Sequence, residues 1–382
     1  MTDFARRARE AMQARGVSTR QLARELKYDP GCLSRVLNGR QRPSQQLADA
    51  LDRFLGADGT LTDATTAPDE PSAGFPEEPS GVDGEIAHMR ATIDHLVAHD
   101  NRYGGDEIAS AAVRVWRSAQ HRLDNGAIPE PRRGDYLASA AEVAELAGWL
   151  LFDADQQDAS RTATLEAHML ARHAGDRSME RFALTNLAMQ DVEVDRPGEF
   201  LRIADELLSH PRIPPRIALL ARLRRGRALA CMGEHRRALD DLGTARAALQ
   251  DSITPRDPAW TWWVNDCELS GHEGEALLAL GDADAAVPKM ERAAELSAAF
   301  RPEGRGTLYY QVSLVQAYTV ARAWRECASA LDAIPPKLGL ISSGRNRRHL
   351  RTALRAVGRH PGTPTHLSEL ARDIASSHLT AA

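Results

Sequence analysis

The sequence predicts an all-α protein made of a small N-terminal domain, a flexible linker and a long C-terminal array of helices. Apolar residues recur at helical spacing through most of the 382 residues, and strand-like alternation is essentially absent. A chain of this length is too long for one compact core. Residues 57–84 interrupt the helical pattern with prolines, glycines and acidic residues, and they contain no Lys or Arg. These observations divide the chain into a domain at 1–56, a linker at 57–84 and an array at 85–382.

Charge also separates the N-terminal domain from the rest of the chain. The formal net charge is −5, but residues 1–56 carry eleven Lys and Arg against six Asp and Glu, which makes +5. The remainder therefore carries −10. A basic domain joined to an acidic body suggests that only the N-terminal domain meets phosphate groups.

Other features of the composition predict a soluble cytoplasmic protein. No apolar run approaches the ~20 residues that a membrane span needs. The N-terminus lacks the apolar segment of a signal peptide. No CxxC pair occurs, so neither a disulfide framework nor a zinc site is expected. The four scattered cysteines are Cys32, Cys231, Cys267 and Cys327.

Residues 18–43 predict two short helices joined by a tight turn. Ser18 can cap the first helix, with Gln21 at the capping-box position. Asp29 can cap the second helix, and Pro30 suits its first turn because the missing N–H costs little there. The side chains expected to face the core are Leu22, Ala23, Leu26, Leu33, Val36 and Leu37.

Four short motifs in this region carry a resemblance to a known family. They are Gln21-Leu22-Ala23, Leu33-Ser34-Arg35, Asn38-Gly39-Arg40 and Pro43-Ser44. With further helices expected at 4–15 and 44–55, the region from Phe4 to Gly56 resembles the phage-repressor-like helix-turn-helix family of the xenobiotic-response-element (XRE) type. The resemblance implies binding to an operator in double-stranded DNA, with the second helix of the pair in the major groove. We expect a homodimer that is held together by the helical body, residues 85–382.

The resemblance also implies which residues meet DNA. Arg35 matches a base-reading position, where a guanidinium can bond guanine O6 and N7 together. Gly31 and Cys32 match positions that face base edges, but the family more often has polar residues at Pro30 and Gly31. Recognition would then depend on Arg35, on DNA shape and on the spacing of two half-sites. The whole implied surface comprises Thr19, Arg20, Pro30, Gly31, Cys32, Ser34, Arg35, Arg40 and Arg42.

The linker prediction rests on composition alone. Pro68, Pro71, Pro76 and Pro79 stand among Gly, Ser, Thr and acidic residues. Such a segment cannot bury enough apolar surface to offset the entropy of ordering it, so we expect a flexible spacer.

Apolar spacing predicts helices throughout the array. Similar segments begin at Gly198, Gly233 and Gly281, and a period near ~34 residues built from helix pairs resembles the tetratricopeptide repeat (TPR). An all-α bundle with coincidental similarity is the alternative. The expected helices span 86–103, 106–124, 135–152, 159–174, 178–193, 198–209, 214–231, 235–250, 261–280, 283–299, 305–320, 324–333, 345–358 and 365–377.

The chain as a whole resembles an actinobacterial architecture in which this type of DNA-binding domain is fused to TPR-like repeats. In the array, segments such as Leu146-Ala147-Gly148-Trp149 and Pro258-Ala259-Trp260 carry that resemblance. It implies a concave face that holds a peptide, a small-molecule effector or a protein partner. The alternative is that the tryptophans are core and the polar groups bond neighbouring helices. The residues proposed for effector binding are Asn186, Gln190, Arg222, Arg225, Trp263 and Asp266.

Signatures of catalysis are missing from the sequence. His272-Glu273 lacks the second histidine of an HExxH site, and neither a phosphate-binding glycine loop nor a nucleophile elbow occurs. We therefore expect no enzyme activity, no metal and no cofactor. The expected function is transcription regulation. The alternative is a TPR-like interaction scaffold, or an antitoxin-like or host-defence regulator, in which the DNA-binding domain is auxiliary.

Overall fold

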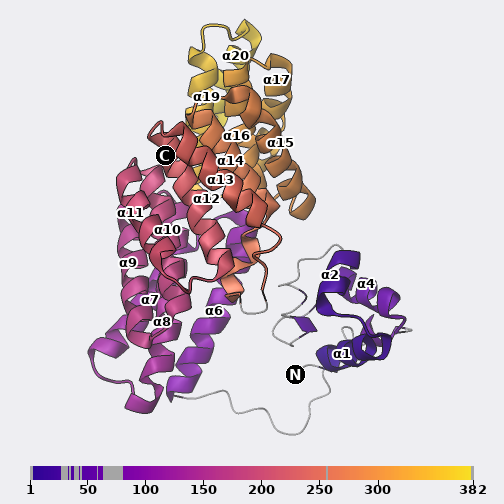
Figure 1. The fold of residues 1–382 in the computed structure, drawn as a ribbon, viewed down its shortest axis with the longest axis vertical. Coiled ribbons are helices and arrows are strands. Elements are labelled where there is room, and N and C mark those ends of the chain that lie inside the picture. The colour runs from indigo at the N-terminus through magenta and orange to yellow at the C-terminus, as the bar shows by residue number, and fades with distance from the viewer. Residues whose placement is uncertain are drawn as a thin grey trace. The chain divides into compact units, whose positions relative to one another are not determined.

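The computed structural model describes residues 3–26, 33, 36, 37, 43, 45–57, 59–62, 81–254 and 257–379 (Figure 1). These residues form helices, turns and loops, and no strand occurs among them, which confirms the all-α prediction. The chain separates into two compact units, Met1–Glu78 (unit 1) and Pro79–Ala382 (unit 2). Each unit has its own hydrophobic core.

Unit 1 contains three of the predicted helices around a small apolar core; of the second helix of the predicted pair, only Leu33, Val36 and Leu37 lie among the described residues. Helix α2 begins after Ser18, whose Oγ accepts a hydrogen bond of 3.2 Å from the backbone N–H of Gln21, as the capping prediction requires. Leu22 and Leu33 are fully buried in this core, and Ala23, Val36 and Leu37 are buried with them. The longer helices described in unit 1 are α1 (Asp3–Arg15), α2 (Thr19–Leu26) and α4 (Gln45–Leu55).

The segment expected to be a linker is structured at both ends. Leu61 is fully buried in the core of unit 1. The buried Asp52 accepts hydrogen bonds from the backbone N–H groups of Gly59 and Leu61, both at 2.7 Å. At the other end, helix α6 already begins at Gly81. The composition of residues 57–84 did not predict these boundaries, because Leu61 and the carboxylate of Asp52 order the segment after α4. Residues 63–80 lie outside the described part of the chain, and so do the four prolines of the predicted linker.

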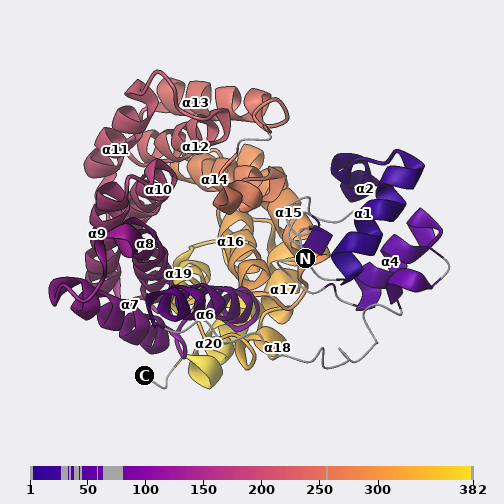
Figure 2. The same ribbon diagram turned by 90° about the horizontal axis from the view of Figure 1, so that it is seen from below.

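Unit 2 is a series of antiparallel helix pairs that curves into a ring (Figure 2). Helices α8, α10, α12, α14, α16 and α19 line the inside of the ring, and α9, α11, α13, α15, α17 and α20 form its outside. The bounds are α6 (Gly81–Tyr103), α7 (Ala109–Asp124), α8 (Glu130–Asp153), α9 (Gln157–Ala174), α10 (Arg177–Glu193), α11 (Pro197–Ser209), α12 (Pro215–Cys231), α13 (His235–Ala248), η1 (Ala259–Trp263), α14 (Asp266–Ala279), α15 (Ala283–Phe300), α16 (Arg305–Ala321), α17 (Trp324–Asp332), α18 (Pro335–Leu338), α19 (Gly344–Arg359) and α20 (Thr365–His378).

In two successive helix pairs, a glycine lets the inner helix cross closely over its outer partner. A Cβ atom on Gly226 of α12 would lie 2.8 Å from Leu242 Cγ of α13. A Cβ on Gly274 of α14 would lie 2.8 Å from Met290 Cγ of α15. The same contact thus recurs in successive helix pairs, so the pairs are structural repeats and the similarity in sequence is not coincidental.

The two ends of unit 2 meet and close the ring. Helix α16 contacts α6, and α19 contacts α8. The backbone N–H of Ser342 donates to the carbonyl oxygen of Tyr103 at 2.6 Å, and the N–H of Gly344 donates to Asp106 Oδ1 at 2.8 Å. Gly104 has φ +95°, and a Cβ there would lie 2.9 Å from the carbonyl carbon of Ser342. We call the contacts of residues 103–106 with residues 341–344 the ring closure.

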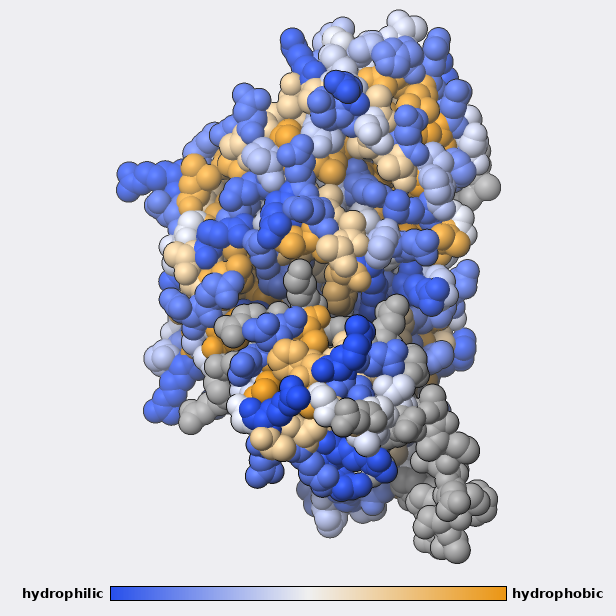
Figure 3. Space-filling view, turned by 90° about the vertical axis from the view of Figure 1, so that its right-hand side faces the viewer, coloured by the Kyte–Doolittle hydropathy of each residue, from blue (hydrophilic) through white to orange (hydrophobic). Residues whose placement is uncertain are grey.

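No helix among the described residues is long and apolar enough to cross a membrane. The face shown in Figure 3 mixes hydrophilic residues with small, separate hydrophobic areas.

Candidate functional site

Unit 1 shows part of the predicted DNA-binding surface. Thr19 is half-buried at the start of α2, and Arg20 follows it in the first turn. Not every basic residue of this unit is available to DNA, because Arg15 donates a hydrogen bond of 2.8 Å to the carbonyl oxygen of Phe54 and so ties α1 to α4. The other implied DNA contacts lie outside the described residues: Pro30, Gly31, Cys32, Ser34, Arg35, Arg40 and Arg42.

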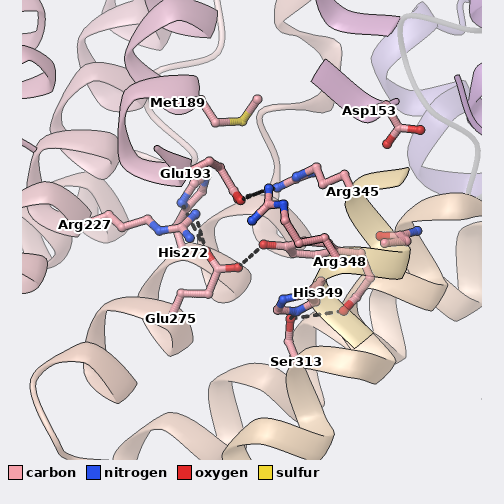
Figure 4. Close-up of polar contacts among 12 residues, drawn as sticks. Asp153, Met189, Glu193, Arg227, His272, Glu275, Ser313, Arg345, Arg348 and His349 are labelled. Carbon is pink, nitrogen blue, oxygen red and sulfur yellow. Dashed lines mark hydrogen bonds and ion pairs between the residues drawn. The ribbon is translucent and has the colours of Figure 1, made fainter. Parts of the chain in front are cut away.

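In unit 2, polar side chains from five inner helices gather inside the ring (Figure 4). They point toward one another from α10, α12, α14, α16 and α19. Arg224, His272, Tyr309 and Arg345 are buried, the other members are half-buried, and most members are joined by ion pairs or hydrogen bonds. We call them the inner polar cluster: Glu193, Arg224, Arg227, Glu268, His272, Glu275, Tyr309, Tyr310, Arg345 and His349.

Arg345 is the most fully engaged cation of the cluster. Its Nη2 lies 3.1 Å from Glu193 Oε1, which joins α19 to α10. Its guanidinium also lies over the rings of Tyr309 and Phe152, 4.3 and 4.8 Å from their centroids. Burial alone would raise the pKa of Glu193, but Arg345, Arg227 and Arg348 outweigh it and hold that pKa well below the ordinary value. This part of the cluster holds the last inner helix against an early one.

A second group of contacts centres on Glu275. Arg227 forms an ion pair with it, and the Tyr309 hydroxyl donates to Glu275 Oε1 at 2.5 Å. The His349 ring stacks on Tyr309 with centroids 4.7 Å apart, and His349 Nε2 lies 3.0 Å from Ser313 Oγ. Burial lowers the pKa of His349 to about 4, so this ring is neutral at neutral pH.

Arg224 stands apart because its hydrogen-bond partners are neutral. One Nη donates to the carbonyl oxygen of Thr185, and the other lies 3.8 Å from Met189 Sδ. The guanidinium lies 5.5 Å from the ring centroid of Trp263. Among the described residues no carboxylate forms an ion pair with it, and burial lowers the pKa of Arg224 to about 10.

A buried carboxyl and a row of aromatic rings lie close to Arg224. Asn186 Nδ2 donates a hydrogen bond to Glu145 Oε1. Burial raises the pKa of Glu145 to about 8. The rings of Phe182 and Trp260 stack with centroids 4.4 Å apart, and Trp260 lies 6.5 Å from Trp263.

The residues that the sequence proposed for effector binding fall into two groups, which differ in the helices that they contact. Asn186 bonds the neighbouring inner helix α8, and Trp263 lies beside Arg224. Gln190 donates to the carbonyl oxygen of Gln157 at 2.5 Å. The polar atoms of these residues therefore also serve contacts between helices.

Three other members of that set lie between inner and outer helices. Arg222 and Arg225 both pair with Asp241 of α13, at 3.3 and 2.7 Å. Asp266 pairs with Arg246 of α13 and, at 3.3 Å, with Arg292 of α15. These contacts correspond to the alternative in which the polar groups bond neighbouring helices.

Sequence reasoning missed Arg224 and Arg345, the two most buried arginines of the inner polar cluster. The apolar residues of α12 lie on several sides of the helix, so no single hydrophobic stripe indicates which side faces inward. Arg224 also stands among Arg222, Arg225 and Arg227, so the sequence does not indicate which of the four arginines faces inward.

Among the described residues, no group of three or more His, Cys, Asp or Glu side chains is arranged to hold a metal ion. Cys231, Cys267 and Cys327 are free thiols.

Comparisons with known proteins bear on the two units separately. Residues 3–65 match the family model described as a helix-turn-helix domain. The chain is also similar to a crystal structure of a Rap protein complexed with competence and sporulation factor, with a TM-score of 0.49 and 11% identity over 77% of this chain and 87% of that chain. No curated protein sequence matches this chain. The chain thus carries a helix-turn-helix domain at its N-terminus. The structure itself shows that the all-α helical repeats of unit 2 follow this domain.

Proposed function

We propose that the protein is a sequence-specific DNA-binding transcriptional regulator of the XRE type. The observation that carries the proposal is the match of residues 3–65 to the helix-turn-helix domain family. The capped helix α2 and the buried Leu22 and Leu33 support it, because they form the core that such a helix pair needs. The charge of +5 on residues 1–56, against −10 on the remainder, supports DNA contact by this end of the chain.

The proposed regulator binds its operator as a homodimer. Two domains would then meet half-sites one DNA turn apart, ~34 Å, or a multiple of that distance. Arg35 would read a guanine, and the neighbouring arginines would neutralise phosphates.

We further propose that unit 2 senses a peptide, a small molecule or a protein partner and has no catalytic role. The inner polar cluster supports this role, because burying so many charged groups costs free energy that apolar packing would not require. The protein would act in the cytoplasm, as in the actinobacterial architecture that the sequence resembles.

A gel-shift assay with the full-length protein and the DNA upstream of its own gene tests the DNA-binding proposal. We expect a shift that survives competitor DNA, weakens steeply with salt and is lost in Arg35→Ala. Arg355→Ala is the matched control, because it removes the same charge from an exposed position on α19. If the wild-type protein fails to bind DNA even at low salt, the proposal is wrong, and the interaction scaffold becomes the better account.

A further inference from the structure

We propose that Arg224 binds the carboxylate of a ligand that also carries a flat apolar group. The inference rests on the proposed sensing role of unit 2 and names the ligand class and its position on the inner face. It starts from one observation: Arg224 is a buried cation whose hydrogen-bond partners are all neutral.

The position of Arg224 is unusual among the arginines of the inner helices. Only 2% of its surface is exposed, and its Nε has no hydrogen-bond partner among the described residues. Arg227 and Arg345 each form an ion pair with a glutamate. A buried cation without a paired anion is costly, so a protein that keeps one has either a structural or a binding use for it.

The carboxyl groups near Arg224 are already occupied. Glu268 lies 3.0 Å from His272 Nε2 and also accepts from the Tyr310 hydroxyl at 3.5 Å. Glu145 bonds Asn186, and its pKa of about 8 leaves most of it protonated at pH 7. Glu268 is ionised and its charge favours the Arg224 cation, but among the described residues neither carboxyl group forms an ion pair with Arg224, so no carboxylate contacts the guanidinium directly.

The surroundings indicate what the anion is attached to. Phe182, Trp260 and Trp263 form an aromatic row beside Arg224, and all three rings are only half-buried. Asn186 lies one helical turn after Phe182 on α10 and is half-buried too, so its amide can bond a polar link between ring and carboxylate.

Access to the guanidinium is controlled by a flexible side chain. Met189 Sδ lies 3.8 Å from an Arg224 Nη, and its unbranched side chain can adopt other rotamers. Figure 4 shows Met189 projecting from α10 toward the cluster. We infer that a ligand reaches the guanidinium when Met189, itself buried, adopts another rotamer. A carboxylate joined through an amide to an aromatic ring matches these groups, whether it comes from a small acid or from the carboxyl terminus of a peptide.

The test uses two pairs of probes that differ only in charge. Hippurate is compared with hippuramide, and the peptide Gly-Gly-Phe with its C-terminal amide. Binding to the full-length protein is measured by tryptophan fluorescence and by the shift in Tm, since a ligand that binds only the folded state raises Tm. We expect a saturable response to at least one carboxylate and none to the matching amide. A response to hippurate alone indicates a small acid, and a response to the peptide alone indicates a peptide.

Two variants test whether the carboxylate binds at Arg224. Arg224→Met should weaken carboxylate binding by about tenfold or more, because it removes a charge-assisted hydrogen bond. Arg236→Met is the matched control, since Arg236 is exposed on the outer helix α13, and it should bind as the wild type does.

Three results would overturn the proposal. They are an equal response to carboxylate and amide, an unchanged affinity in Arg224→Met, and the absence of any saturable response in the wild-type protein. The gel-shift assay is independent of these measurements. Loss of DNA binding with intact hippurate binding would refute the DNA-binding proposal alone, and the reverse would refute only this inference.

Discussion

Arg224 and Arg345 occupy similar positions on the inside of the ring, but they differ in whether a carboxylate pairs with them. Both are nearly inaccessible to solvent, with 2% and 7% of their surfaces exposed. Arg345 has a glutamate 3.1 Å away, and although burial opposes its charge, Tyr309 and Glu193 raise its pKa. Burial instead lowers the pKa of Arg224 to about 10. Burial alone therefore does not tell what a charged residue does. The presence of a paired carboxylate separates a cation that holds helices together from one that is available to a ligand.

The largest expected effect is the loss of the paired cation. Arg345→Met would remove one of the two arginines of α19 that pair with Glu193 of α10, and would leave Arg348, 2.9 Å away, as the remaining ion-pair partner. Breaking a buried ion pair costs about 3–5 kcal/mol, so we expect the free energy of unfolding to fall by that amount in urea denaturation.

Two variants control this experiment. Arg355→Met removes an exposed arginine from the same helix and should change stability by less than about 0.5 kcal/mol. The double variant Arg345→Met, Glu193→Gln should recover part of the loss, because the glutamate charge is removed as well. A loss below about 1 kcal/mol in Arg345→Met would show that the pair does not hold the ring closed.

The second prediction concerns Glu145, the carboxyl near Arg224 that does not pair with it. Its pKa is about 8 in the folded chain against 4.5 for the unconstrained group, so between these pH values the folded state binds more protons. Stability should therefore fall as pH rises from 4.5 toward 8, by about 3 kcal/mol between pH 4.5 and 7. Glu145→Gln should flatten this slope, because a neutral amide oxygen still accepts from Asn186.

Urea denaturation across this pH range measures the slope. Glu107→Gln removes an exposed carboxylate and should leave the slope as in the wild type. A wild-type slope that persists in Glu145→Gln would mean that Glu145 is ionised in the folded protein, and Arg224 would then have a second charged carboxylate near it besides Glu268.

The third prediction tests the ring closure between residues 103–106 and 341–344. At Gly104 the positive φ and the nearby carbonyl group of Ser342 both oppose a side chain. Gly104→Ala should therefore cost about 1–3 kcal/mol. Hydrogen exchange should also become faster at the Ser342 amide, which donates to Tyr103.

Gly358→Ala is the matched control for this substitution. Gly358 is an exposed helical glycine, and a Cβ atom added to it would meet nothing within 4 Å. Alanine there should stabilise α19 by about 0.5–1 kcal/mol. Equal effects of the two substitutions would mean that the closure contributes nothing to stability.

The helices and the core of unit 1 were predictable from the sequence because they depend on local patterns. The Ser18 cap and the buried Leu22 follow from residues within a few positions of each other. The ring closure was not predictable in this way. It joins Asp106 to Gly344, 238 residues apart, through backbone groups and one carboxylate that leave no periodic signal. The role of Arg224 was not predicted for a related reason. It depends on the lack of an ion-pair partner in the folded protein, which no local pattern of the sequence indicates.

The smallest expected effect is also the most direct test of the comparison. Arg224→Met removes a cation that has no ion pair among the described residues, and it replaces the cation with an unbranched apolar side chain. The substitution leaves the Thr185 carbonyl oxygen without this donor, which costs about 1 kcal/mol, but it also removes the penalty of a buried charge. We therefore expect the free energy of unfolding to stay within about 1 kcal/mol of the wild-type value or to rise. Arg345→Met, in contrast, should lower it by about 3–5 kcal/mol. If both substitutions destabilise the protein equally in urea, Arg224 is a structural residue like Arg345, and the distinction between the two arginines fails.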